Sequence, residues 1–119
     1  MRVQLQSQTL RLRIDEAELA RLLAGDTLRD ELRWPDGRIE QHQLALAARA
    51  GWRRDADGWC MALPDTAVRS LAARLPSRDG LRLELAVPQG PALQVLFDVD
   101  VRDSARQRLP KRPPAKDAS

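Results

Sequence analysis

LRDELRWPDGRIEQHQLALA (residues 28–47) recurs further along the chain as LRLELAVPQGPALQVLFDVD (residues 81–100). Seven of the twenty aligned positions are identical, including the proline and the glycine of a Pro-x-Gly sequence in the middle of each stretch. Apolar and polar residues alternate on both sides of this Pro-x-Gly, a pattern that predicts two antiparallel strands joined by a tight turn. The chain is therefore predicted to contain the same β-hairpin twice.

The segments before these hairpins also match each other, although more weakly. This match rests only on apolar residues in phase, which are Ile14, Leu19 and Leu22 in the first copy and Leu63, Val68 and Leu71 in the second. Each copy predicts two short strands, a helix that begins near Asp15 or Pro64, and the hairpin described above. We predict two β-β-α-β-β units, at about residues 1–47 and 48–101, in one α+β domain. Its eight mostly antiparallel strands would make either a strongly bent sheet or an eight-stranded barrel, with two helices.

The net charge of +3 is concentrated at the carboxyl-terminal end of the chain. Residues 102–119 hold 6 of the 20 basic and 2 of the 17 acidic side chains, together with three prolines and almost no apolar residues. Such a segment cannot bury enough apolar surface to offset the loss of chain entropy on folding. We predict a single folded domain at residues 1–101 and a disordered basic tail at residues 102–119.

Residues 1–14 alternate between polar and apolar side chains and lack the apolar run that a signal peptide or a membrane span needs. The only cysteine, Cys60, provides neither a disulfide nor a set of metal ligands. It is expected on the outer face of its strand, beside Trp52. These features predict a cytoplasmic protein that does not associate with membranes and that holds no metal and no cofactor.

The two hairpins differ in polarity at three inward-facing positions, where the second has Leu83, Leu93 and Val95 and the first has Asp30, Glu40 and His42. The register of the Pro-Asp-Gly turn places Asp30 directly opposite His42, with Cβ atoms about 5 Å apart. A carboxylate at that distance would orient the imidazole, as a general base or a metal ligand requires. A solvated hairpin that extends beyond the core would carry the same residues, so both interpretations stay open.

Five arginines alternate with the inward-facing residues and therefore point to the outer faces of their strands. If these strands were neighbours, the side chains would form a basic band suited to nucleic acid or another polyanion. Glu31 and Glu84 lie between them, however, as is typical of a solvated sheet with cross-strand ion pairs. With one Phe and no Tyr, the chain also offers few side chains on which bases could stack. The five are Arg11, Arg13, Arg29, Arg33 and Arg82.

The segment at residues 1–25 contains Met1, Arg2 and Val3, then Ser7, Gln8 and Thr9, then the sequence LRLRI at residues 10–14, then Glu18 and Leu19. It resembles a family of small uncharacterised bacterial proteins that open with a short strand, a Gly-Asn-Ser turn, an Ile/Leu-Arg-x-Arg-Leu strand and a helix with a Glu-Val start. The turn departs from that pattern. Because the family has no established activity, the resemblance implies no function.

The sequence favours a small binding or protein-interaction module over an enzyme. Its partner would be another protein or a second copy of the chain in a homodimer. Two alternatives stay open. One is nucleic-acid or polyanion binding through the strand arginines and the basic tail, and the other is an enzyme that uses the Asp30 and His42 pair.

Overall fold

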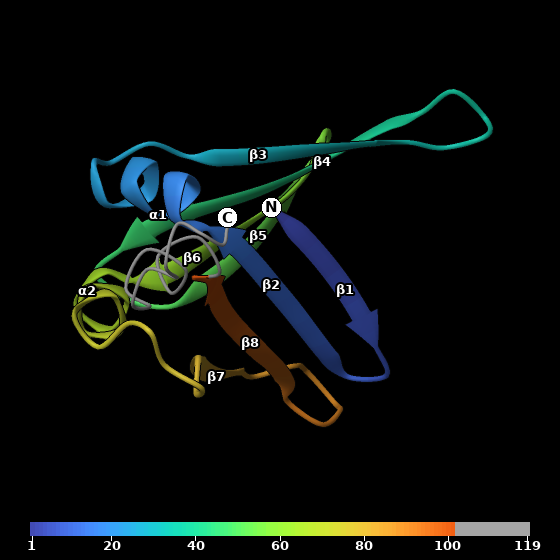
Figure 1. Cartoon of the computed structure of the whole chain (residues 1–119). Coiled ribbons are helices and arrows are strands. Elements are labelled where there is room, and N and C mark those ends of the chain that lie inside the picture. The colour runs from blue at the N-terminus through green and yellow to red at the C-terminus, as the bar shows by residue number, and fades with distance from the viewer. Residues whose placement is uncertain (102–119) are drawn as a thin grey trace, which may run out of the picture.

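Eight strands and two helices follow one another in the predicted order in a computed structural model that describes residues 1–101 (Figure 1). The predicted tail at residues 102–119 lies outside the described residues. The elements are β1 (Arg2–Gln6), β2 (Thr9–Asp15), α1 (Glu16–Leu23), β3 (Leu28–Arg33), β4 (Ile39–Ala47), β5 (Gly51–Asp55), β6 (Gly58–Pro64), α2 (Asp65–Ala73), β7 (Leu81–Leu85) and β8 (Leu93–Asp100). The α+β prediction is confirmed.

The internal repeat corresponds to a structural duplication. Strands β1 and β2 of the first unit are the counterparts of β5 and β6, and β3 and β4 are the counterparts of β7 and β8. Identical residues make the same contact in both copies, because Gln41 donates a side-chain hydrogen bond to Glu31 (3.4 Å) and Gln94 donates one to Glu84 (2.8 Å). The cross-strand registers are also equivalent, so the molecule has an internal pseudo-twofold relation.

The two hairpins of each unit belong to different sheets. Sheet A has the strand order β1-β2-β8-β7, and sheet B has the order β3-β4-β6-β5. Inside each sheet, the two units meet through a parallel pair, β2 with β8 or β4 with β6, while all other pairs are antiparallel. The barrel alternative is wrong, because the strands in residues 1–101 divide into two four-stranded sheets and do not close.

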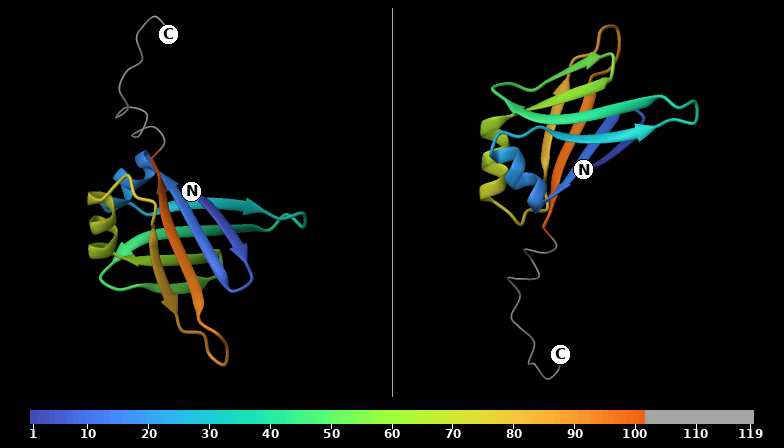
Figure 2. Two further views of the ribbon diagram at one scale, coloured as in Figure 1. Left: turned by 60° about the horizontal axis from the view of Figure 1, so that its bottom comes forward. Right: turned by 90° about the horizontal axis from the view of Figure 1, so that it is seen from above.

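The hydrophobic core fills the space between the two sheets, and the helices cover it at one side of the molecule (Figure 2). Both helices contact both sheets. Asp15 and Glu18 form a capping box at the start of α1, whereas α2 follows Pro64 and has no side-chain cap. The fully buried side chains include Leu12, Ile14, Leu22, Leu28, Leu44, Met61, Leu63, Val68, Val95 and Phe97.

The β3–β4 hairpin extends beyond the other strands and points away from the helices (Figure 1). Its turn is closed by hydrogen bonds from Gly37 N–H to Trp34 O (2.9 Å) and from Trp34 N–H to Arg38 O (2.8 Å). Gly37 has a φ of +88°, which side chains rarely adopt and which explains the glycine in Pro-Asp-Gly. Among residues 1–101, no helix is long and apolar enough to cross a membrane.

Candidate functional site

Asp30, Glu40 and His42, the three polar residues that are apolar in the second copy, lie together on the inner face of the β3–β4 hairpin. As the turn register predicts, Asp30 is opposite His42 and Leu32 is opposite Glu40. The symmetry-related positions in β7 and β8 hold Leu83, Val95 and Leu93, and Val95 is fully buried there. The first copy thus carries a histidine where the second copy has a core valine.

His42 is buried against the indole of Trp59, its neighbour in β6. The two rings are stacked, with centroids 4.6 Å apart and planes inclined by 16°. Its Nε2 atom lies 2.7 Å from the Glu40 carboxylate, while its Nδ1 atom is buried and has no hydrogen-bond partner. A proton on Nδ1 would be buried without an acceptor, so this environment favours the tautomer in which Nε2–H donates to Glu40.

The Glu40 carboxylate is held in its ionised form. The interaction with His42, chiefly its hydrogen bond, lowers the pKa of Glu40 below the ordinary value of 4.5, against desolvation, which raises it. The Trp34 side chain and the positive charge of Arg54 also lower this pKa. No ion pair joins Glu40 to an arginine within residues 1–101. Its carboxylate is therefore oriented by the His42 ring and contacts no guanidinium of residues 1–101.

Asp30 lies opposite His42 in the strand register, but the histidine hydrogen-bonds to Glu40. The Asp30 side chain has no hydrogen bond or ion pair to any of residues 1–101. A general base needs a nitrogen that can reach a substrate proton. One nitrogen of His42 is bonded to Glu40 and the other is buried, so this arrangement positions Glu40 and does not expose a base.

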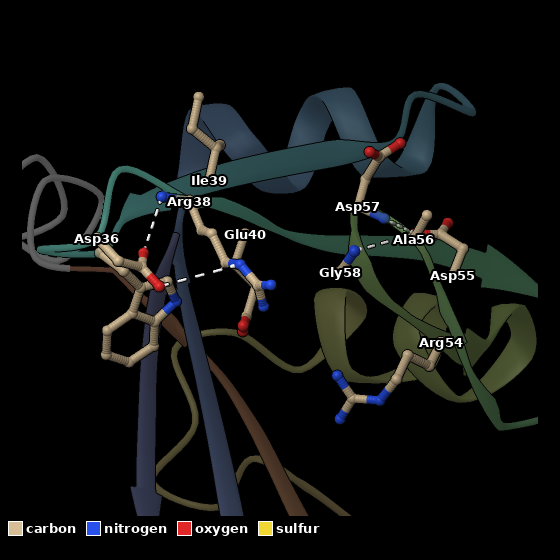
Figure 3. Close-up of a pocket in the computed structure, with 10 residues that line it drawn as sticks. Asp36, Arg38, Ile39, Glu40, Arg54, Asp55, Ala56, Asp57 and Gly58 are labelled. Carbon is tan, nitrogen blue, oxygen red and sulfur yellow. Dashed lines mark hydrogen bonds and ion pairs between the residues drawn. The ribbon is translucent and has the colours of Figure 1, made fainter.

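A pocket of about 330 Å³ opens between the β3–β4 turn and the β5–β6 turn. Figure 3 shows Asp36, Arg38 and Glu40 on one side of it and the segment 54–58 on the other. Trp34 and Ile39 complete its lining. We call it the charged pocket, because four of its ten lining residues are acidic and two are basic.

The place related to the charged pocket by the pseudo-twofold symmetry holds an apolar pocket of about 420 Å³. Three of its lining residues, Gln8, Val87 and Leu93, are the counterparts of Asp57, Trp34 and Glu40 in the charged pocket. It is also lined by Trp52, Leu85, Ala86 and Pro88. The duplicated fold thus builds a hollow twice, and only one of the two contains charges.

The candidate arginines are divided between the two sheets. Arg11 and Arg13 in β2 both pair with Asp98 in sheet A, at 3.1 and 2.9 Å. Arg82 in β7 lies near Arg11 beside a small pocket of about 120 Å³ on the same sheet. The remaining two, Arg29 and Arg33, belong to β3 in sheet B. A single basic band across all five does not form.

The predicted neighbourhood of Cys60 needs a correction. Cys60 is paired with Gln43 and Arg53, whereas Trp52 is paired with Met61 and therefore lies on the inner side of sheet B, at its edge. The physical reason is the register of the β5–β6 hairpin, in which Asp55 is opposite Gly58. Directly opposite residues share one face of a sheet, so a difference of one residue in the pairing reverses the face of a side chain.

Sequence reasoning missed Trp34, Trp59 and Arg54 as parts of the site. For Trp34 and Trp59 the internal repeat contained a signal, because their symmetry-related residues, Val87 and Leu10, are aliphatic.

The part of the chain that the structure describes has no group of three His, Cys, Asp or Glu residues that could hold a metal ion. No known protein family and no curated protein sequence matches this chain, so the resemblance of residues 1–25 stays a prediction.

Proposed function

We propose that this protein is a protein-interaction module that holds its partner at the tip of the β3–β4 hairpin and in the charged pocket beside it. The observation that carries this proposal is the divergence between the two copies. Core packing accepts Leu93 and Val95 at the positions where the first copy has Glu40 and His42. A buried histidine nitrogen without a partner lowers stability, and proteins keep such departures mainly where function needs them.

The exposed side chains of the hairpin support the same conclusion. Leu32, Trp34 and Ile39 are 40%, 47% and 44% exposed, which makes them three of the five large hydrophobic residues on the surface of residues 1–101. Leu32 and Trp34 lie on the inner face of the hairpin, and Ile39, which is opposite Arg33, lies on its outer face. Exposed apolar side chains on a projecting element are typical of protein interfaces, and tryptophan is a frequent anchor in them. A partner could therefore contact the hairpin and the charged pocket together.

The alternatives have less support from the geometry. Neither nitrogen of His42 is available to a substrate, and two of the five candidate arginines are engaged by Asp98. A cytoplasmic location is part of the proposal, because the unpaired thiol of Cys60 suits a reducing compartment.

Site-specific photocrosslinking in the source cells tests the proposal. The photoreactive residue p-benzoylphenylalanine replaces Arg38, whose side chain is 86% exposed at the rim of the charged pocket. Irradiation should yield a discrete covalent adduct with another protein, and Trp34→Ala should reduce its yield at least about tenfold because the aromatic anchor is lost. The same photoreactive residue at Ala73, an exposed position in α2, is the matched control.

A discrete adduct from position 38 that position 73 does not give supports the proposed function. Identical adducts from both positions, or no adduct from position 38, would overturn it. An adduct with a second copy of the chain would identify the interaction as self-association.

A further inference from the structure

The charge of Glu40 is fixed in position by a chain of aromatic contacts. Trp59 stacks on His42, and His42 donates to the Glu40 carboxylate at 2.7 Å. Because the histidine is only 9% exposed and its ring packs flat against the indole, it cannot turn away from Glu40 without disrupting the core. The carboxylate therefore presents its negative charge to the charged pocket in a defined orientation.

No guanidinium or ammonium group of residues 1–101 forms an ion pair with Glu40. Its hydrogen-bond partner is the Nε2 atom of the His42 ring, and the Trp34 side chain lines the pocket beside it. Arg54 is drawn toward Trp52, over whose ring its guanidinium carbon lies at 5.1 Å from the centroid. A ligand cation would thus meet a carboxylate that contacts no arginine or lysine side chain of residues 1–101.

Two of the other three carboxylates of the pocket, those of Asp36 and Asp55, have structural roles. Asp36 accepts the backbone N–H of Arg38 at 2.9 Å, and Asp55 accepts those of Asp57 and Gly58 at 2.8 and 3.0 Å. These bonds build the two turns that form the walls of the pocket. The carboxylates still contribute negative charge, so the lining as a whole is acidic and attracts cations.

Trp34 adds an aromatic surface next to this carboxylate. Its side chain lines the charged pocket and remains 47% exposed. A guanidinium or ammonium group placed against an indole face gains a cation–π interaction of about 0.5–2 kcal/mol in addition to its attraction to the carboxylate. A neutral or anionic group would gain neither.

We propose that the charged pocket binds an organic cation, namely a guanidinium or ammonium group, between the Glu40 carboxylate and the Trp34 ring. The inference rests on the proposed function, in which the cation is the side chain of an arginine or lysine in the partner. It follows from four replacements at symmetry-related positions, since Trp34, Glu40, His42 and Trp59 stand where the other unit has Val87, Leu93, Val95 and Leu10. The apolar pocket of the second unit has the same architecture without the carboxylate and serves as an internal comparison.

Titration of the ¹⁵N-labelled full chain, followed by amide chemical shifts, tests this inference. The probes are N-acetylarginine amide and N-acetyllysine amide, and the matched neutral probe is N-acetylcitrulline amide, which has the shape of arginine without its charge. Both cations should shift the amide signals of residues 34–40 and 54–58 and should bind at least about tenfold more tightly than the citrulline probe.

Two variants locate the effect. Glu40→Gln keeps a hydrogen-bond acceptor for His42 and should weaken binding of both cations about tenfold or more. Glu31→Gln makes the same change of charge on the same hairpin, but on its outer face, and should leave the affinity within about twofold. The thermal unfolding of each variant is measured to show that it is folded.

A comparison of agmatine with the peptide acetyl-Gly-Arg-Gly-amide then identifies the source of the cation. Tighter binding of the peptide assigns the cation to a protein segment, whereas equal binding assigns it to a free small molecule, and both results support a cation site. Equal affinity for the arginine and citrulline probes, or cation binding that Glu40→Gln leaves unchanged, would overturn the inference. Because photocrosslinking at position 38 does not depend on charge, it would still test the proposed function after such a result.

Discussion

Glu40 connects the chemistry of the charged pocket with the stability of the fold. Its pKa in the folded state lies below the ordinary value of 4.5, chiefly because His42 donates to the ionised carboxylate. A lowered pKa means that the ionised form stabilises the native state at every pH above about 4.5, and that this contribution is lost as the pH falls through the folded value.

Glu40→Gln should therefore lower the melting temperature by a few degrees near neutral pH, and the difference from the native protein should shrink toward about pH 3. Thermal unfolding followed by circular dichroism at several pH values measures this. His42→Phe is the control background, because it retains a ring against Trp59 and removes the Nε2–H donor. A Glu40→Gln effect with the same size and pH trend in that background would assign the lowered pKa to another cause.

The close approach of strands β4 and β6 requires a glycine at position 58. Gly58 has a φ of +151°, and a Cβ atom at this position would lie 1.9 Å from the backbone oxygen of Gln41 in the neighbouring strand β4. Gly58→Ala should destabilise the protein by about 2–4 kcal/mol, measured by urea unfolding, since the β4–β6 pairing must shift. Gly51→Ala is the matched control, because its Cβ would meet nothing within 4 Å, and it should change stability by less than about 1 kcal/mol.

Comparison of the two copies within one sequence identified Asp30, Glu40 and His42, because packing alone would have kept these positions apolar. It could not decide which carboxylate contacts the histidine. Asp30 is across the strand pair and Glu40 is two residues away on the same strand, so both share one face with His42. The orientation of the ring decides, and that orientation comes from its stacking on Trp59 in β6, a contact between units that the hairpin register does not predict.

At the level of elements, local turn and cap residues made the boundaries predictable. The Pro-Asp-Gly turn fixed the β3–β4 register because Gly37 supplies the left-handed conformation at the one position that needs it. The β5–β6 turn likewise has a glycine at a positive φ, Gly58, directly after its two-residue loop, Ala56 and Asp57. The register of that turn pairs Trp52 with Met61 and Arg53 with Cys60, so the predicted face of Trp52 is wrong by one residue.

The two helices differ in how they begin. Asp15 accepts the backbone N–H of Glu18 at 2.7 Å, and the Glu18 side chain accepts the N–H of Asp15 at 3.0 Å, while Pro64 offers α2 no side-chain cap. Asp15→Ala should lower the free energy of unfolding by about 1 kcal/mol, whereas Asp15→Asn, which can still accept the hydrogen bond, should retain most of the stability. Equal losses in both variants, measured by urea unfolding, would show that the charge and not the cap is responsible.

For the whole molecule, the sequence predicted the two units but not how they combine. Turn chemistry acts between strands that follow each other, so it predicts hairpins and says nothing about which hairpin edges join. The parallel pairing of β2 with β8 brings together residues that are far apart in the chain, such as Leu10 and Val95. That pairing is decided by the burial of both inner faces at once, which is why the two separate sheets were not predicted.

This exchange of hairpins means that neither unit contains a complete sheet. Each sheet takes one hairpin from residues 1–47 and one from residues 48–101, and both helices pack against both sheets. An isolated two-stranded hairpin is at best marginally stable in water, so a single unit has too little buried surface to fold alone. The peptides 1–48 and 49–101, cut in the exposed β4–β5 loop, should each give the narrow amide spectrum of an unfolded chain.

Mixing the two peptides at equal concentration should restore the dispersed amide spectrum of the intact chain, because the parallel β2–β8 and β4–β6 pairs can form between them. The midpoint of unfolding should then depend on concentration, as expected for an association. The same peptides with Gly58→Ala in the second one provide a negative control, since that change blocks the β4–β6 approach. A dispersed spectrum from a monomeric peptide 1–48 alone would contradict the prediction and would mean that the duplicated unit is itself a folding unit.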